Sequence, residues 1–317
     1  MKIAILGTGV LATVYGAMLA RAGHEVVLLG RPAAVRRVAA SPARLTGALD
    51  VTQQLQAETV PHWVRRNGSA DLLLVCTKAI TTEEQLAPLR GARLGGAASF
   101  QNGVLKDGYL AQVVGVDRVI TAETMLSAAL TGEGVVVVTK GAALLSGPAD
   151  PVPFARALQS AGLPVDISDD PASLVWSKAS IVAAGFGVSC LSRQPAQGIF
   201  PSPLLAGLFL DLVEEVGGVA AALGVQLRDY PALPAGTFMA QSREDNLSLL
   251  RDLGRQLQSA PAPQRVSMLQ DLEAGRPLEV EEVLGGMTAQ AERAGVSTPT
   301  LHFCYRLLSG LEELRSK

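Results

Sequence analysis

The stretch KIAILGTGVLATVYGAMLARAGHEVVLLGR, residues 2–31, decides the fold of this chain. It opens with an apolar strand pattern, passes through a glycine-rich turn into a helix pattern, and closes on a second apolar strand. Strand, helix and strand within about 30 residues is the size of one βαβ unit. The stretch therefore predicts an α/β protein that begins with a Rossmann-type, doubly wound sheet.

The glycine turn of this stretch has the spacing GxGxxA. Gly7 permits a tight turn, Gly9 lets a pyrophosphate approach the backbone, and the small Ala12 lets the helix pack on the strand. The start of the following helix offers amide groups and a positive dipole end to phosphates. We therefore predict a dinucleotide site. Its residues are Gly7, Thr8, Gly9, Val10, Leu11 and Ala12.

An arginine follows the second strand, where NAD-binding domains usually carry an acidic residue for the ribose 2′-hydroxyl. Arg31 stands at that position and suits a 2′-phosphate, so NADP(H) is favoured over NAD(H). Arg36 and Arg37 are close enough in the sequence to make the same contact instead, which would leave Arg31 a solvated loop residue.

Two later strand patterns end in polar residues. ADLLLVCTK ends at Lys78, and GGAASFQNG ends at the pair Asn102-Gly103. Ligands bind at the carboxyl ends of parallel strands, so Lys78 is expected to face the cofactor. Asn102 could bond the cofactor or simply form a turn, since Asn-Gly is a common turn pair. Further β segments are expected around a Lys140-Gly141 turn and in SAGLPVDIS, residues 160–168.

Composition limits what the chain can be. A length of 317 residues suits two domains, and 48% hydrophobic with 18% charged residues excludes general disorder. The net charge of −2 argues against a nucleic-acid or membrane binder and favours a small-molecule partner. Three widely spaced cysteines suggest neither disulfides nor a metal site. We expect a cytoplasmic protein without a signal peptide, with domains at 1–168 and 169–317.

The second half is predicted to be an all-helical domain with one unusual lysine. Lys178 lies in LVWSKASIVAAGF, residues 174–186, an otherwise almost wholly apolar run. Val182 and Phe186 follow at four and eight positions and share its helix face. A buried ammonium must be paired or functional, although a lysine at the edge of a helix face can also reach water along its own stem.

A second segment of this half is RVSMLQDLEAGRPLEVEEVLGG, residues 265–286. Ser267 opens one helix, Gly275 and Pro277 break it, and Glu279 falls in the first turn of the next. By spacing alone, both Ser267 and Glu279 are explained as helix caps.

Together these motifs resemble those of the ketopantoate reductase family, the 2-dehydropantoate 2-reductases, over nearly the whole chain. The resemblance rests on motifs in the family's order: GTGVLA, Arg31, CTK, QNG, WSK and SMLQDLEAGRPLE. It implies a cytoplasmic enzyme of pantothenate biosynthesis that uses NADPH to reduce a 2-oxo acid. Arg31 and Lys78 would flank the 2′-phosphate of the cofactor, with Asn102 beside the nicotinamide ribose.

The resemblance also implies the catalytic roles. Lys178 would protonate the keto oxygen as hydride arrives, Glu279 would orient that lysine, and Ser267 would bind the substrate carboxylate. A positive donor placed where alkoxide charge develops stabilises the transition state.

One departure concerns the substrate. Where the family pattern has asparagines, this chain has Val182 and Phe186, and a third asparagine is replaced near Gln197. Loss of these amides should weaken recognition of a hydroxyl and favour a more apolar 2-oxo acid, although ketopantoate is the best single candidate. A non-catalytic NADP(H)-binding sensor is the alternative from another class. The long apolar helices of the second half fit either a homodimer or that half's own core.

Overall fold

The computed structural model describes residues 1–131, 134–138, 141–259 and 263–315. The chain divides into two compact units. Unit 1 comprises Met1–Gln101 and Leu105–Pro171, and unit 2 comprises Asn102–Val104 and Ala172–Lys317. The main boundary therefore lies three residues after the predicted one, and the short segment Asn102–Val104 is grouped with the helical unit.

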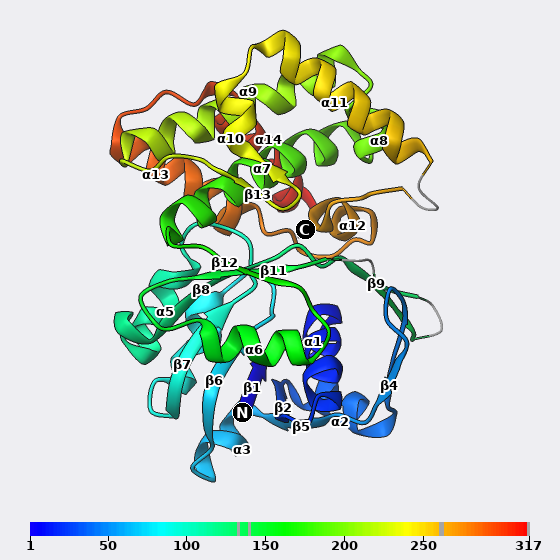
Figure 1. The fold of residues 1–317 in the computed structure, drawn as a ribbon, viewed down its shortest axis with the longest axis vertical. Coiled ribbons are helices and arrows are strands. Elements are labelled where there is room, and N and C mark those ends of the chain that lie inside the picture. The colour runs from blue at the N-terminus through cyan, green and yellow to red at the C-terminus, as the bar shows by residue number, and fades with distance from the viewer. Residues whose placement is uncertain (132–133, 139–140, 260–262, 316–317) are drawn as a thin grey trace. The chain divides into compact units, whose positions relative to one another are not determined.

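A mixed sheet forms the centre of unit 1 (Figure 1). Within the described residues it has eight strands, in the order β12 (Val165–Ile167), β11 (Ala143–Ser146), β8 (Val119–Thr124), β7 (Arg93–Ser99), β6 (Ser69–Val75), β1 (Lys2–Leu6), β2 (Glu25–Gly30) and β5 (Gln56–Thr59). All neighbours are parallel except β8 and β11. The chain runs from β1 to β2 on one side and later to β6 on the other, so the strand order reverses beside β1. This reversal is where ligands bind in such sheets.

Both faces of the sheet are buried, as a parallel sheet requires. Along β1, Ile3 and Ile5 enter one core, whereas Ala4 and Leu6 enter the other. The first core includes α1 and α6, and the second includes α3, α4 and α5 (Figure 1). The unbroken apolar sequence of the strand follows from this two-sided burial, and the predicted doubly wound architecture is confirmed.

The helices of unit 1 are short. They are α1 (Val10–Arg21), α2 (Pro32–Ala40), α3 (Val60–Arg65), α4 (Thr82–Leu86), η1 (Ala87–Leu89), α5 (Lys106–Val114), η2 (Val116–Arg118) and α6 (Val152–Ser160). A second sheet pairs β4 (Val51–Gln53), β3 (Ala43–Gly47), β10 (Val136–Val138) and β9 (Ala128–Leu130). The β segments expected on either side of the Lys140-Gly141 turn are β10 and β11, which belong to different sheets; Lys140 itself lies outside the described residues.

Unit 2 is built around long apolar helices. Its elements are α7 (Pro171–Ser192), α8 (Ala196–Ile199), α9 (Pro203–Ala222), α10 (Ala235–Ala240), α11 (Arg243–Gln258), α12 (Ser267–Glu273), the π-helical turn η3 (Glu281–Gly285), α13 (Gly286–Ala294) and α14 (Pro299–Arg315). One hydrophobic core joins side chains of α7, α9, α13 and α14.

The predicted all-helical character needs one correction. Two strands of two residues each, β13 (Asp229–Tyr230) and β14 (Leu233–Pro234), form a small antiparallel hairpin in unit 2. The prolines of this segment have no backbone N–H to donate to a helical hydrogen bond. The Asp229 carboxylate accepts a hydrogen bond from the amide of Thr237 at 2.8 Å. The segment is therefore a turn that leads into α10.

Helix α7 is long and apolar enough to cross a membrane by length and composition alone, the one such helix in the described part of the chain. Of its most apolar window, 72% is buried inside the structure. Packing in the core of unit 2 accounts for this apolar sequence.

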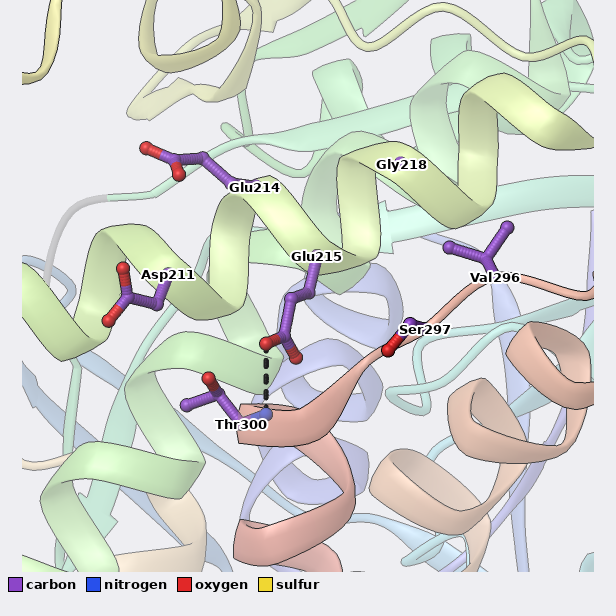
Figure 2. A pocket seen from close by; sticks show the side chains of 7 residues that line it. All are labelled: Asp211, Glu214, Glu215, Gly218, Val296, Ser297 and Thr300. Carbon is purple, nitrogen blue, oxygen red and sulfur yellow. Dashed lines mark hydrogen bonds between the residues drawn. The ribbon is translucent and has the colours of Figure 1, made fainter.

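The start of α14 is capped by a side chain of another helix. Glu215 of α9 accepts a hydrogen bond from the amide of Thr300 at 2.9 Å (Figure 2). It accepts a second one from the amide of Leu301 at 2.8 Å. The first amides of a helix have no partner within it, so this carboxylate supplies two of the missing acceptors. The contact fixes α14 against α9.

We predict that Glu215→Ala lowers the free energy of unfolding by about 1–2 kcal/mol, the range for loss of a helix cap. Urea unfolding followed by circular dichroism measures this. Glu214→Ala is the matched control, because Glu214 pairs with Arg243 at the surface and such pairs contribute about 0–1 kcal/mol. Equal losses in the two variants would contradict the capping role.

Candidate active site

The glycine turn lies at the point where the strand order reverses. Gly7 has φ +129°, and a Cβ added there would lie 3.1 Å from the carbonyl carbon of Cys76, directly after β6. Any side chain at residue 7 would be strained and would push the ends of β1 and β6 apart. The tight turn predicted for Gly7 is therefore present. Glycine is required there because a side chain would collide with the backbone of Cys76.

The rest of the turn suits a bound pyrophosphate. Gly9 is exposed and precedes α1, and an added Cβ there would meet nothing within 4 Å. Thr8, Val10 and Leu11 are partly buried, whereas Ala12 is fully buried on α1. The first turn of α1 carries no acidic residue that would repel an anion. An open backbone at a helix start fits the phosphates of a dinucleotide.

Two arginines lie beside this turn. Arg31 precedes α2 directly after β2, where Gly30 is so close to Thr8 that an added Cβ would lie 2.6 Å from the Thr8 methyl group. Arg37 reaches back from α2 and donates to the Thr8 carbonyl at 3.1 Å. Both arginines are exposed. Arg37 therefore holds the turn, whereas the exposed Arg31 and Arg36 stay the candidates for contact with a ligand phosphate.

Lys78 is exposed just beyond β6, as the strand pattern predicts. Its backbone carbonyl accepts a hydrogen bond from the Gln101 side chain at 3.0 Å. Sequence reasoning assigned no role to Gln101. Unit 1 therefore brings the glycine turn, Arg31 and Lys78 to the same edge of the sheet.

Asn102 is grouped with unit 2. The next residue, Gly103, has φ +98°, and a Cβ there would lie 2.9 Å from the carbonyl oxygen of Glu282. The segment that carries Asn102 therefore packs closely against η3, which begins two residues after Glu279. The glycine of the QNG motif is required by this close approach as well as by the turn.

Lys178 is buried on α7, with 6% of its surface exposed. The helix is buried on most sides and lies in the core of unit 2. An edge lysine whose head reaches water would be far more exposed, so the structure favours the functional interpretation. Its catalytic role stays a prediction.

The two apolar residues that follow Lys178 differ in exposure. Phe186 is 3% exposed and belongs to the hydrophobic core, whereas Val182 is only partly buried. Gly185, seven residues after Lys178 and so on the same face, would place a Cβ 3.3 Å from Val266. This face of α7 therefore meets the chain just before Ser267. The prediction of a changed substrate pocket rests on Val182 more than on Phe186.

Ser267 begins α12, as predicted, but it is not the cap of that helix. The capping position is Val266, which makes no side-chain bond, and no hydrogen bond of the Ser267 hydroxyl is seen within the described part of the chain. Ser267 is itself partly buried. Asp271 lies four residues after Ser267. Its carboxylate pairs with the Arg276 guanidinium at 2.8 Å and so fixes the loop that leads to Glu279.

Glu279 is a buried carboxylate, with 3% of its surface exposed. It lies immediately before the helical turn rather than within it, and its backbone carbonyl accepts from Val283 at 3.1 Å. The π-helical turn η3 follows Glu279. The Tyr305 hydroxyl of α14 donates a hydrogen bond to the Glu281 carboxylate of this turn at 2.6 Å. Turns of this kind are frequent at functional sites. Unit 2 thus contains a buried lysine, a buried glutamate, Ser267 and Asn102.

The other candidate features do not extend this site. Burial raises the pKa of Cys190 to about 12 and that of Cys304 to about 11, and it also raises the pKa of Cys76. These thiols stay protonated near neutral pH, as expected of packing residues. The hollow of Figure 2 lies in unit 2 beside Asp211, Glu214 and Glu215 and contains none of the predicted site residues.

Comparison with known proteins agrees with both halves of this description. The family model "Ketopantoate reductase PanE/ApbA" matches residues 3–151, and its counterpart "Ketopantoate reductase PanE/ApbA C terminal" matches residues 172–312. The 2-dehydropantoate 2-reductase of Pyrococcus abyssi is 25% identical over all of both chains. That of Mycobacterium tuberculosis is 29% identical over 98% of each chain.

Solved structures show the same fold. The PanE/ApbA family ketopantoate reductase from Ralstonia eutropha JMP134 is 26% identical, with a TM-score of 0.82 over all of both chains. D-mandelate dehydrogenase, solved with NADH and anilino(oxo)acetate, has a TM-score of 0.84 over 100% of this chain and 99% of its own, at 21% identity. That likeness concerns the fold alone. With two family models that together span most of its length, this chain belongs to the ketopantoate reductase family of NADP-dependent oxidoreductases.

Proposed function

We propose that this protein uses NADPH to reduce a 2-oxo acid to a 2-hydroxy acid, with 2-dehydropantoate as the best single substrate and pantoate as its product. The observation that carries the proposal is Lys178. It is a buried ammonium on an otherwise apolar helix, in the unit that also buries Glu279 and carries the partly buried Ser267 at the start of α12.

The proposed reaction divides the work between cofactor and protein. NADPH, when bound, supplies the hydride for the carbonyl carbon. The Lys178 ammonium would donate a proton to the carbonyl oxygen. The C=O double bond would thereby become a C–O single bond with a new C–H and a new O–H bond, leaving NADP+ and a neutral Lys178. Glu279 holds the lysine in its donating position and favours its charged form. Ser267 donates a hydrogen bond to the substrate carboxylate.

The residues of unit 1 fit the cofactor. The open backbone at Gly9 and the start of α1 suit the pyrophosphate, and the exposed cations Arg31 and Lys78 suit the 2′-phosphate. Asn102 is proposed to bond the nicotinamide ribose.

The substrate and setting are also proposals. Val182 offers no amide to a substrate hydroxyl, which is why a more apolar 2-oxo acid stays the alternative to ketopantoate. The rate of NADPH oxidation, measured with each member of a panel of 2-oxo acids, distinguishes a ketopantoate reductase, a reductase of a more apolar 2-oxo acid and a non-catalytic sensor. We propose a cytoplasmic enzyme of pantothenate biosynthesis. A homodimer is proposed because α9 and α14 expose large apolar side chains such as Leu204 and Phe303.

The first prediction concerns the cofactor. Arg31→Ala should weaken NADPH binding about 10- to 100-fold and leave NADH binding nearly unchanged, because a charge-assisted contact to the 2′-phosphate has no counterpart in NADH. Fluorescence titration gives both dissociation constants. Arg37→Ala is the control: it loses the bond to the Thr8 carbonyl and should affect the two cofactors alike. Equal weakening by Arg31→Ala would refute its assignment.

The second prediction concerns the proton donor. Lys178→Met keeps much of the volume but removes the ammonium, so kcat should fall at least about 100-fold while NADPH still binds. Steady-state turnover and cofactor titration on the same preparation provide the comparison. Near-normal turnover would show that Lys178 has a structural role only.

The third prediction concerns substrate choice. Val182→Asn should raise the ratio of kcat/KM for ketopantoate to that for a branched or aromatic 2-oxo acid severalfold, because a new hydrogen bond to a hydroxyl contributes about 1 kcal/mol. Ile181→Asn, at a neighbouring and similarly half-buried position of α7, is the matched control. If the wild-type protein already prefers ketopantoate strongly, the alternative of a more apolar 2-oxo acid is wrong.

A further inference from the structure

Strand β2 of unit 1 ends in a glycine that its own backbone does not explain. Gly30 is the last residue of β2 and pairs in parallel with Thr59 of β5. Its φ lies outside the left-handed region, in contrast to the +129° of Gly7. Other residues could adopt this backbone, and glycine within a strand lowers stability because it loses more conformational freedom on folding. Gly30 is also partly exposed, so it is not a tightly packed core position.

The reason for this glycine lies in the neighbouring glycine turn. A Cβ added to Gly30 would lie 2.6 Å from the methyl group of Thr8 and 3.3 Å from its hydroxyl. A β-branched side chain has few rotamers with which to avoid such a contact. The turn itself is tied down, because Arg37 donates to the Thr8 carbonyl at 3.1 Å and the Gly7 amide donates to the Leu29 carbonyl at 2.9 Å. The Thr8 methyl group therefore closes the end of β2 to a side chain at position 30.

This end of β2 is the place that matters for cofactor choice. In NAD-binding domains an acidic residue there binds the ribose 2′-hydroxyl. Here the strand ends at Gly30, and Arg31 follows directly as the residue before α2. A carboxylate at position 30 would lie beside the glycine turn, where its charge would repel a 2′-phosphate.

We propose that Gly30 is a second specificity-determining position of the 2′-phosphate site, and that Thr8 decides which residues this position can take. The inference rests on the proposed function, in which Arg31 meets the 2′-phosphate of NADPH. Selection then has two parts, since Arg31 attracts the phosphate and the contact between Thr8 and Gly30 excludes the carboxylate that would favour NADH. The residues of this contact all belong to unit 1.

Two acidic variants test this selection. Thr8→Ala leaves only a Cβ, which lies 3.6 Å from the added atom, at ordinary contact distance. In Thr8→Ala/Gly30→Asp, the ratio of the Kd of NADPH to that of NADH should rise about 100-fold over that in Thr8→Ala. The carboxylate weakens the phosphate contact and accepts from the ribose hydroxyl, at about tenfold for each. Gly30→Asp alone should weaken both cofactors alike, because it displaces Thr8 and the glycine turn. Fluorescence titration gives all of these constants.

Two further comparisons separate charge from shape. Thr8→Ala/Gly30→Asn matches the acidic double variant in size without its charge, and its ratio should stay within about threefold of that in Thr8→Ala. The thermal midpoint reports the contact without any cofactor. Gly30→Ala should lower it by about 2–6 °C when Thr8 is present, the effect of overpacking, but should leave it nearly unchanged in the Thr8→Ala background.

Several results would overturn the proposal. They are a Gly30→Asp variant that shifts toward NADH as far as the double variant, a double variant that keeps the wild-type ratio or does not fold, and equal midpoint losses from Gly30→Ala in the two backgrounds. Failure of the proposed function gives a different result, because the wild-type protein would then show no preference for NADPH over NADH.

Discussion

The close contact between the ends of β1 and β6 is the constraint on which unit 1 depends. Because Gly7 has no side chain, its backbone can lie against the carbonyl group of Cys76. That contact permits the tight turn into α1 and leaves the backbone of Gly9 open to a ligand. The same strand end leads to Lys78, whose carbonyl is bonded by Gln101 from the end of β7. One missing side chain therefore permits both the tight turn and the open backbone at the start of α1.

Each unit also contains a buried lysine, and the two follow different rules. Lys106 is surrounded by acceptors, two of them backbone carbonyls, and its hydrogen bonds give the chain a fixed path at Gln101. Lys178 lies in an apolar helix, in the same unit as the buried Glu279. The two lysines are thus buried in different surroundings, Lys106 among backbone and carboxylate acceptors and Lys178 on an apolar helix.

The segment Asn102–Val104 connects these two kinds of site along the chain. It is flanked by Gln101 and Leu105 of unit 1 but packs with unit 2, where Gly103 approaches the backbone of Glu282. The segment that carries Asn102 therefore packs against the π-helical turn that follows Glu279. Glycine is needed at residue 103 because any side chain would collide with that carbonyl group.

The sequence by itself determined the doubly wound sheet, the glycine turn and the helical second half, because those features depend on local periodicity and on residues with special backbone freedom. It also identified Lys178, since a charge in an apolar run is visible without a structure. It did not reveal β3, β4 and β5, whose short strands have little pattern, or the hairpin within unit 2. Only the tertiary structure showed that Phe186 is a core residue, that Ser267 caps nothing and that Lys106 is buried against Glu123. Those properties arise from residues far apart in the chain, and packing between distant segments leaves no periodic signal in the sequence.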